Sequence, residues 1–268
     1  MRIRFGVVAV LCLAVAGACG VSVADDAAAS GLSIEVSTGQ PEPGPLRLVG
    51  SRDRRQLVAT GVSAAPIDVD VTGAVAWRVE PATLATVEPG GMLIPLADGQ
   101  GQVVATLEGA SEVAVPLIVE RIGNDPPIDF ISQIVPVFTK YGCNGGGCHG
   151  KSGGQNGFRL SLLGFEPAED HEHLVKEARG RRISLVAPET SLLLAKAAAE
   201  VPHGGGKLIE VGSPSYELVA EWIREGARPS GAEPPRVSRI EVFPAERTLL
   251  AGQRQQLRVM AFFDDGRI

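Results

Sequence analysis

Hydrophobic and polar residues alternate along the first part of the chain, which predicts short β-strands. Four segments alternate in this way or are rich in β-branched residues: 32–36, 56–60, 67–71 and 113–119. Turn-forming residues such as Pro89 and Gly90 separate the strands, and turns roughly every 8–12 residues are typical of a β-sandwich. We therefore expect an all-β sandwich over residues 31–121, with Trp77 as a core side chain between its two sheets.

The hydrophobic pattern becomes helical after a proline-containing linker at 124–127. Three later segments predict helices: 130–138, 191–200 and 216–225. Ser213 is a start signal for the last of these helices, and Gly226 is a stop signal. A second proline-rich linker, at 232–235, closes this part of the chain. We expect a small all-α domain over residues 129–229.

The strand pattern returns at Val237 and continues to the last residue. Residues 254–257 (RQQL) echo residues 54–57 (RRQL), and alternating apolar residues follow both. The echo predicts that residues 237–268 begin a second copy of the first β region. Because so short a segment cannot close a sandwich core, we expect it to be truncated and to pack poorly.

The N-terminus has the pattern of an export signal. Two arginines precede an apolar run at 5–18. Small residues at 22–24 form a cleavage site after Ala24, so that residues 1–24 would be removed as a signal peptide. The alternatives are a lipid anchor at Cys19 or a retained anchor, although the run is short for a membrane span. We expect an exported protein of the periplasm or cell surface.

Composition narrows the classes of function. The net charge of −6 offers no basic surface for a nucleic-acid backbone, so no nucleic-acid partner is expected. With Cys12 and Cys19 in the removed signal, the mature chain keeps only Cys143 and Cys148. One close pair of cysteines is not a disulfide scaffold, so the pair indicates a local role.

The segment Cys143–His149 (CNGGGCH) indicates attachment of haem c. Two cysteines followed directly by a histidine is the pattern in which both thiols bind haem covalently and the imidazole ligates iron. The usual spacing has two residues between the cysteines, whereas four separate Cys143 from Cys148. The additional residues must loop outward, and the glycines at 145–147 suit this loop because glycine adopts left-handed conformations at little cost.

A six-coordinate haem needs a second axial ligand, usually methionine or histidine. Both methionines of the mature chain, Met92 and Met260, lie in the β regions. His203 lies in a glycine-rich loop between two predicted helices and is our candidate. His171 and His173, in an acidic run that favours a surface position, are alternatives, as is an open site. Ligation by two histidines predicts a low reduction potential.

Three other interpretations of the cysteine segment remain open. Cys143 and Cys148 could form a disulfide in an oxidising compartment. They could instead bind zinc together with a histidine, since structural zinc takes four such ligands. The segment could also be a structural glycine-rich loop alone.

Residues 130–227 resemble the cytochrome-c-like domains of large exported proteins of planctomycete-type bacteria. Those domains often run from a Cys-Cys-His-Gly motif to a Trp-Ile-x-x-Gly-Ala ending, and the matching residues here are Cys143, Cys148, His149, Gly150 and 222–227. Many relatives carry a Met-Pro-Pro loop before the last helix, where this chain has Val201, Pro202 and His203. This departure favours a histidine ligand over a methionine.

The flanking β regions are similar to bacterial immunoglobulin-like repeats, through the Arg-x-Gln-Leu strand and Trp77. The resemblance implies an Ig-like sandwich, a cytochrome-c-like domain and an incomplete second Ig-like segment. We expect a haem-binding electron carrier with an unidentified redox partner, rather than an enzyme, because no hydrolase or kinase motif is present. The alternative is a cell-surface protein whose β domains bind a partner or carbohydrate, with the cysteines only forming a disulfide.

Overall fold

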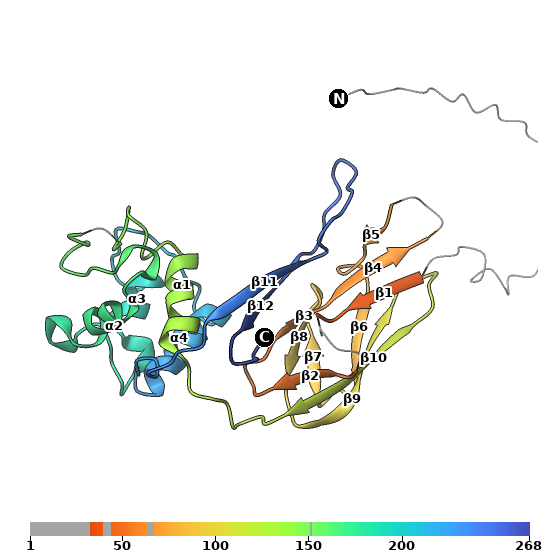
Figure 1. Ribbon diagram of the computed structural model, residues 1–268, viewed down its shortest axis with the longest axis horizontal. Coiled ribbons are helices and arrows are strands. Elements are labelled where there is room, and N and C mark those ends of the chain that lie inside the picture. The colour runs from red at the N-terminus through yellow and green to blue at the C-terminus, as the bar shows by residue number, and fades with distance from the viewer. Residues whose placement is uncertain (1–32, 40–43, 64–66, 151) are drawn as a thin grey trace, which may run out of the picture.

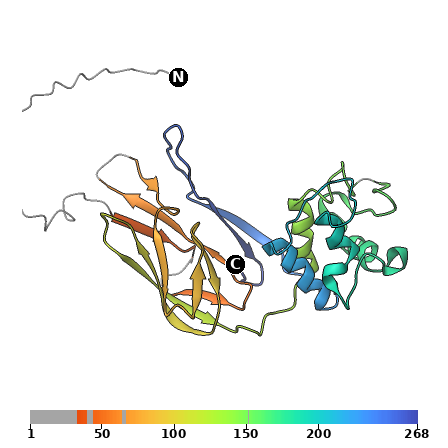
Figure 2. The same cartoon turned by 180° about the vertical axis from the view of Figure 1, so that it is seen from behind.

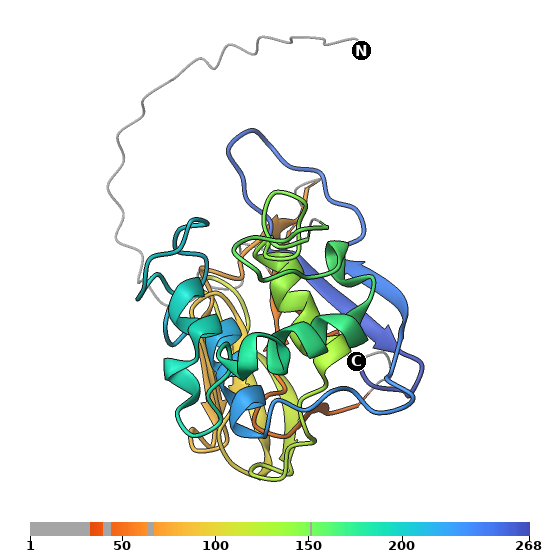
Figure 3. The ribbon, with the colours of Figure 1, turned by 90° about the vertical axis from the view of Figure 1, so that its left-hand side faces the viewer.

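The computed structural model describes residues 33–39, 44–63, 67–150 and 152–268. The expected signal peptide at 1–24 lies outside these residues. Strands fill 33–120 and return at 237–263, with the helices between them, so the molecule is largely β-sheet with a few short helices. Figures 1 and 2 show, from opposite sides, the helices gathered at one end, and Figure 3 views that end directly.

The first β region is built from three sheets. Its strands are β1 (Ser33–Ser37), β2 (Leu46–Val49), β3 (Arg55–Gln56), β4 (Val58–Val62), β5 (Val69–Asp70), β6 (Ala76–Glu80), β7 (Ala85–Val87), β8 (Met92–Pro95), β9 (Gly99–Thr106) and β10 (Val113–Glu120). The sheet orders are β2-β10-β9-β6, β3-β8-β7 and β1-β4-β5. Strand β2 runs parallel to β10, and the other pairs are antiparallel.

The core of the β region follows from alternation along the strands. In β2, Leu46 and Leu48 are buried while Arg47 between them is exposed, because successive side chains point to opposite faces. These leucines pack with side chains of β6, β7, β8, β9 and β10 in one apolar cluster. Trp77 is half-buried and contacts this cluster and a smaller one under β1, with its Nε1 donating to the Thr72 carbonyl at 3.0 Å. It therefore lies between the two clusters rather than fully inside the core.

The helical region contains eight short elements in the described residues. They are η2 (Phe130–Ile134), α1 (Val135–Lys140), η3 (Leu162–Gly164), α2 (Pro167–Val175), η4 (Glu177–Gly180), η5 (Pro188–Thr190), α3 (Leu192–Ala197) and α4 (Pro214–Arg224). The predicted helices at 130–138, 191–200 and 216–225 are confirmed. The Ser213 hydroxyl accepts from the Tyr216 N–H, which is the cap expected at the start of α4.

The core of the helical region joins elements far apart in the sequence. Trp222 on α4 is fully buried, and its ring lies 5.3 Å from that of Phe130 on η2. His171 on α2 packs edge-on against Phe130 at 5.2 Å and bonds through Nε2 to the Ala227 carbonyl at 2.7 Å. His171 and His173 are both buried, so the surface position expected for them is wrong. Helix α2 was not predicted, because its buried face carries Asp170 and two histidines rather than an apolar stripe.

Polar contacts tie the helical region to the β region. Arg52, in the turn after β2, lies 3.4 Å from the carboxylate of Glu225 at the end of α4. The same carboxylate accepts from the backbone N–H of Ile128 in the linker at 2.7 Å. Within the described parts of the chain, no helix is long and apolar enough to span a bilayer.

The last segment forms an antiparallel hairpin of β11 (Val237–Phe243) and β12 (Arg258–Phe263). Its echo of the first β region extends to side-chain geometry, because Gln56 and Gln256 each donate through Nε2 to the following leucine carbonyl, at 2.8 and 2.9 Å. Leu57 is fully buried, whereas Leu257 is 53% exposed. The last segment is therefore poorly packed at Leu257, as expected.

Strand β12 departs from that expectation. Arg258 is buried, and its guanidinium donates to the carbonyl of Ser37 at 2.8 Å and to the Ser37 hydroxyl at 2.9 Å. Phe262 on the same strand is also buried. The hairpin is therefore docked on the first β region through β12, while β11 stays largely exposed.

Candidate functional site

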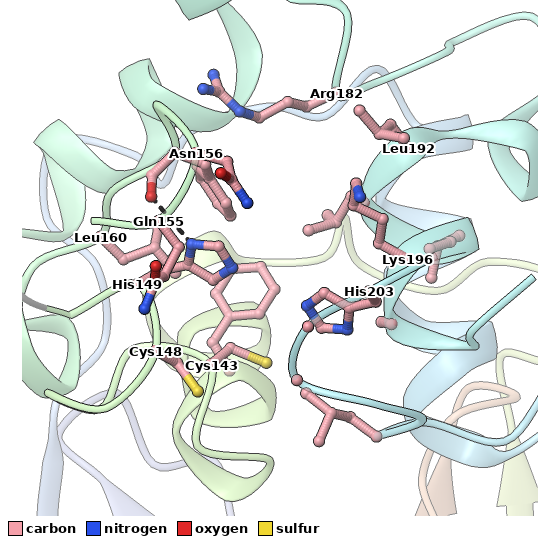
Figure 4. A pocket seen from close by; sticks show the side chains of 18 of the residues that line it. Cys143, Cys148, His149, Gln155, Asn156, Leu160, Arg182, Leu192, Lys196 and His203 are labelled. Carbon is pink, nitrogen blue, oxygen red and sulfur yellow. Dashed lines mark hydrogen bonds between the residues drawn. The ribbon is translucent and has the colours of Figure 1, made fainter. Parts of the chain in front are cut away.

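A pocket of about 400 Å³ lies in the helical region, within the size range of ligand sites (Figure 4). Cys143, Cys148 and His149 line one side, and His203 lines the other. Most of the remaining wall is apolar, with Phe138, Phe158, Leu160, Leu192, Leu193, Leu194, Leu208, Ile209 and Val219. The structure thus brings together the four residues that the sequence singled out, and neither His171 nor His173 is part of this lining.

The loop between the cysteines folds out as a bulge. The His149 N–H donates to the Cys143 carbonyl at 2.9 Å, across a gap of six residues. In a helical turn with the two-residue spacing, the same pair of groups would form the ordinary bond across four residues. The longer loop therefore keeps the connection between the histidine and the first cysteine that a helical turn would provide.

The glycines of this loop do not have the role expected for them. Gly145, Gly146 and Gly147 are not in the left-handed region, which is instead occupied by Gly142, at φ 72°, just before the first cysteine. At Gly150 a side chain would collide with the carbonyl of Asn144. Glycine is thus required at the two edges of the motif, where the chain turns and where it passes close to itself.

Asn144 anchors the bulge, a role that the sequence did not reveal. Its side chain is 1% exposed, and its Nδ2 donates to the Thr139 hydroxyl on α1 at 2.9 Å. The backbone carbonyl of Asn144 accepts from the Leu163 N–H at 3.0 Å. These bonds fix the loop to α1 and η3, so both cysteines are carried on a held backbone.

His149 is held in one orientation and one tautomer. Its Nδ1 lies 2.9 Å from the Phe158 carbonyl, and since a carbonyl can only accept, Nδ1 carries the hydrogen and Nε2 is bare in the neutral ring. Burial lowers the pKa of His149, as do the nearby His203, Arg182 and Lys196, while the bond to Phe158 opposes them. The lowered pKa favours the neutral imidazole that a metal ion needs as a ligand.

His203 faces His149 across the pocket. Its Nδ1 lies 2.9 Å from the Gly206 carbonyl, so its Nε2 is bare by the same reasoning. The two rings are nearly parallel, with an interplanar angle of 4° and centroids 6.4 Å apart. Figure 4 shows the remaining nitrogen of each ring turned toward the other ring.

This separation matches what one metal ion between two imidazoles requires. A first-row metal binds an imidazole nitrogen at about 2 Å and the ring centre lies about 1 Å behind it, so two opposed rings have centres roughly 6 Å apart. A backbone carbonyl that fixes the second nitrogen is the usual support of a ligating histidine. Both histidines have this support.

The two cysteines are free thiols at the edge of the same pocket (Figure 4). Burial, and to a smaller extent the nearby Cys148, raise the pKa of Cys143 to about 11. The Cys143 thiol is therefore protonated at neutral pH and is no activated nucleophile. Within the described residues, no cluster of three or more His, Cys, Asp or Glu is arranged to hold a metal ion.

Two cationic side chains of the wall were also missed from the sequence. Arg182 is buried; its guanidinium donates to the carbonyls of His173 and Gly157, each at 2.6 Å, and lies 4.7 Å from the Phe158 ring. Lys196 on α3 donates to the Pro202 carbonyl at 2.8 Å. Arg182 thus holds the loop that supports His149, and Lys196 holds the loop that carries His203. Both cations lie dozens of residues after the cysteine motif, so nothing in the sequence pattern links them to it.

No family model matches the chain, and no curated protein matches it. Among solved structures, the chain is similar to an intimin mutant of EHEC O157:H7, at 22% identity and a TM-score of 0.23. The match covers 32% of this chain and 45% of that chain.

Proposed function

We propose that this chain is an exported c-type haem protein that carries single electrons. Cys143 and Cys148 would be the covalent anchors, His149 the proximal ligand and His203 the distal ligand. The observation that carries the proposal is the pair of imidazoles of His149 and His203, whose ring centroids lie 6.4 Å apart beside two free thiols. In this proposal, residues 129–229 are a cytochrome-c-like domain between an Ig-like region at 31–121 and an Ig-like segment at 237–268.

The residues present fit haem c. Each cysteine would add its S–H across one vinyl double bond, so that a carbon–sulfur bond forms, the proton goes to the neighbouring vinyl carbon, and no electrons are gained or lost. When bound, the haem supplies one reversible electron at its iron. The cationic Arg181 and Lys196 in the wall complement acidic substituents on a ligand.

The chain's own residues would set the redox behaviour. His149 and His203 give two imidazole ligands, which predicts a lower reduction potential than a methionine–histidine pair. The leucines of α3 and the side chains of Phe138 and Phe158 give the site an apolar lining. Backbone carbonyls fix the tautomer of both imidazoles before any ligand binds, so each ring presents a bare Nε2 to the pocket.

Expression in a bacterial periplasm with haem-attachment machinery tests this function. We expect a Soret band that survives acid–acetone extraction, and its loss in the double variant Cys143→Ser/Cys148→Ser. The absence of covalent haem in the unaltered chain, while a known c-type cytochrome made in the same cells is loaded, would overturn the proposal. If thiol titration then finds no free cysteines, the disulfide and the cell-surface interaction protein become the better interpretation.

Identification of the distal ligand needs a second variant. His203→Ala should convert a six-coordinate low-spin spectrum into a five-coordinate or water-ligated one, while covalent haem is retained. His171→Gln is the matched control, since His171 is buried in the core and does not line the pocket. An unchanged spectrum in His203→Ala would exclude His203 as a ligand.

A further inference from the structure

The two histidines of the pocket are anchored to different extents. His149 bonds to Phe158, which belongs to a separate loop, and Arg182 joins that loop to α2 through its bonds to Gly157 and His173. Arg182 is only 4% exposed, so these charge-assisted bonds are shielded from water. Motion of the His149 ring would require several elements to move together.

The ring of His203 is supported by its own loop. Its ring bonds to Gly206 in its own loop, and the Gly206 N–H bonds back to the His203 carbonyl at 2.9 Å. The glycines at 204–206 are exposed. The ring, its bonding partner and the intervening glycines can therefore move as one unit without breaking the bond that fixes the tautomer.

Lys196 is the side chain that holds this unit against α3. Backbone bonds to α3 pin the loop at its two ends, from Val201 to Ala195 and from Leu208 to Ala197. Between these ends, the Lys196 ammonium donates to the Pro202 carbonyl, directly before His203. Loss of this one bond would release His203 while the ends of the loop stay attached.

We propose that His203 is a displaceable ligand, that Lys196 is its latch, and that the pocket binds small uncharged iron ligands such as carbon monoxide. This inference rests on the haem binding proposed above. With haem bound, His203 Nε2 would give up its bond to the metal and one molecule of carbon monoxide would take its place, with no electron transferred. The apolar side chains of the wall, with Leu192, Leu208 and Ile209 among them, suit a small uncharged ligand.

The test is the rate of carbon monoxide binding to the reduced, haem-loaded protein, measured by stopped flow. Lys196→Met keeps the length of the side chain and removes its donor, and we expect binding about fivefold faster, the factor for one solvent-accessible hydrogen bond. Lys207→Met is the matched control, because Lys207 lies in the same segment and pairs with Glu210 instead. It should bind at the unaltered rate.

The outcomes separate the latch from the haem itself. Equal rates in Lys196→Met and the unaltered protein would overturn the latch. A rate in the unaltered protein as fast as in His203→Ala would overturn displacement of His203. If no haem is attached at all, the proposed function fails, and nuclear magnetic relaxation of the Gly206 amide nitrogen in the haem-free protein still tests Lys196. Greater mobility in Lys196→Met, but not in Lys207→Met, would support the latch, and equal mobility would overturn it.

Discussion

The helical region buries more polar side chains than the first β region, where the described residues include three: Arg55, Thr60 and Thr72. The core of the first β region is leucine, valine and alanine, held between hydrogen-bonded sheets. The helical region also has an apolar core, but it buries in addition the polar side chains of Asn144, Asp170, His171, His173, Arg182 and Ser191. Four of them, Asp170, His171, Arg182 and Ser191, bond to backbone groups of loops. Where sheets do not fix the backbone, buried polar side chains do, and the pocket lies among those loops.

The two tryptophans allow each region to be followed separately. Trp77 lies in the β region and Trp222 in the helical core. Trp222→Phe and Trp77→Phe leave one fluorescent reporter each, so a substitution can be assigned to the region that it destabilises. The free energy of unfolding in urea is measured for each substitution in both of these backgrounds.

Leu93→Ala should have the largest effect, because Leu93 on β8 is fully buried in the β core. We expect a loss of about 2–5 kcal/mol in the free energy of unfolding, from lost burial and the cavity that remains. The loss should appear in the Trp77 transition. Leu96→Ala, at a side chain 51% exposed, is the control and should cost less than about 0.5 kcal/mol. An equal loss in the Trp222 transition would contradict independent cores.

Arg182→Met should destabilise the helical region by about 2–3 kcal/mol, because two charge-assisted bonds are lost and two carbonyls lose their donor. The loss should appear in the Trp222 transition. Arg181→Met, at the exposed neighbour, is the control. A loss no larger than that of the control would show that the apolar core alone fixes the loops of the helical region.

Asn144→Ala should cost about 1 kcal/mol, again in the Trp222 transition. The bond from Nδ2 to Thr139 is lost, but Oδ1 is buried without a hydrogen-bond partner among the described residues, so its removal offsets part of the cost. Asn124→Ala in the exposed linker should be neutral by comparison. An effect as large as that of Arg182→Met would mean that the cysteine loop contributes more to stability than its contacts indicate.

The rate of alkylation of Cys143 reports on the pocket rather than on the stability of either region. Burial raises its pKa to about 11, so at pH 8 the folded protein holds less thiolate than an ordinary cysteine would. In haem-free Cys148→Ser, iodoacetamide should react slowly at pH 8 and faster as the pH rises toward 11. Urea should restore an ordinary rate at pH 8, and equal rates with and without urea would show that Cys143 is solvated in the folded state.

The sequence predicted the elements with a clear period or cap, namely the four named strands, η2 with α1, α3 and α4. It also placed Cys143, Cys148, His149 and His203 in one group, because motif spacing and glycine-rich loops are local signals. It could not predict the buried histidines of α2 or the roles of Arg182 and Lys196. Those depend on which loops meet in space, and their residue types are the ones that usually lie at the surface. The contact of Arg258 with Ser37 could not be predicted for the same reason, because it joins residues far apart in the sequence.

The bond between the His149 N–H and the Cys143 carbonyl fixes the position of the histidine relative to the first cysteine. That position therefore does not depend on the number of residues in the loop between the cysteines. A search pattern that counts residues between two cysteines treats the spacing as fixed and rejects this chain. A pattern that instead asks for a closing bond, with glycine just before the first cysteine and just after the histidine, accepts loops of several lengths. A loop of another length can then present the histidine in the same place, provided that the bond to the first cysteine still closes.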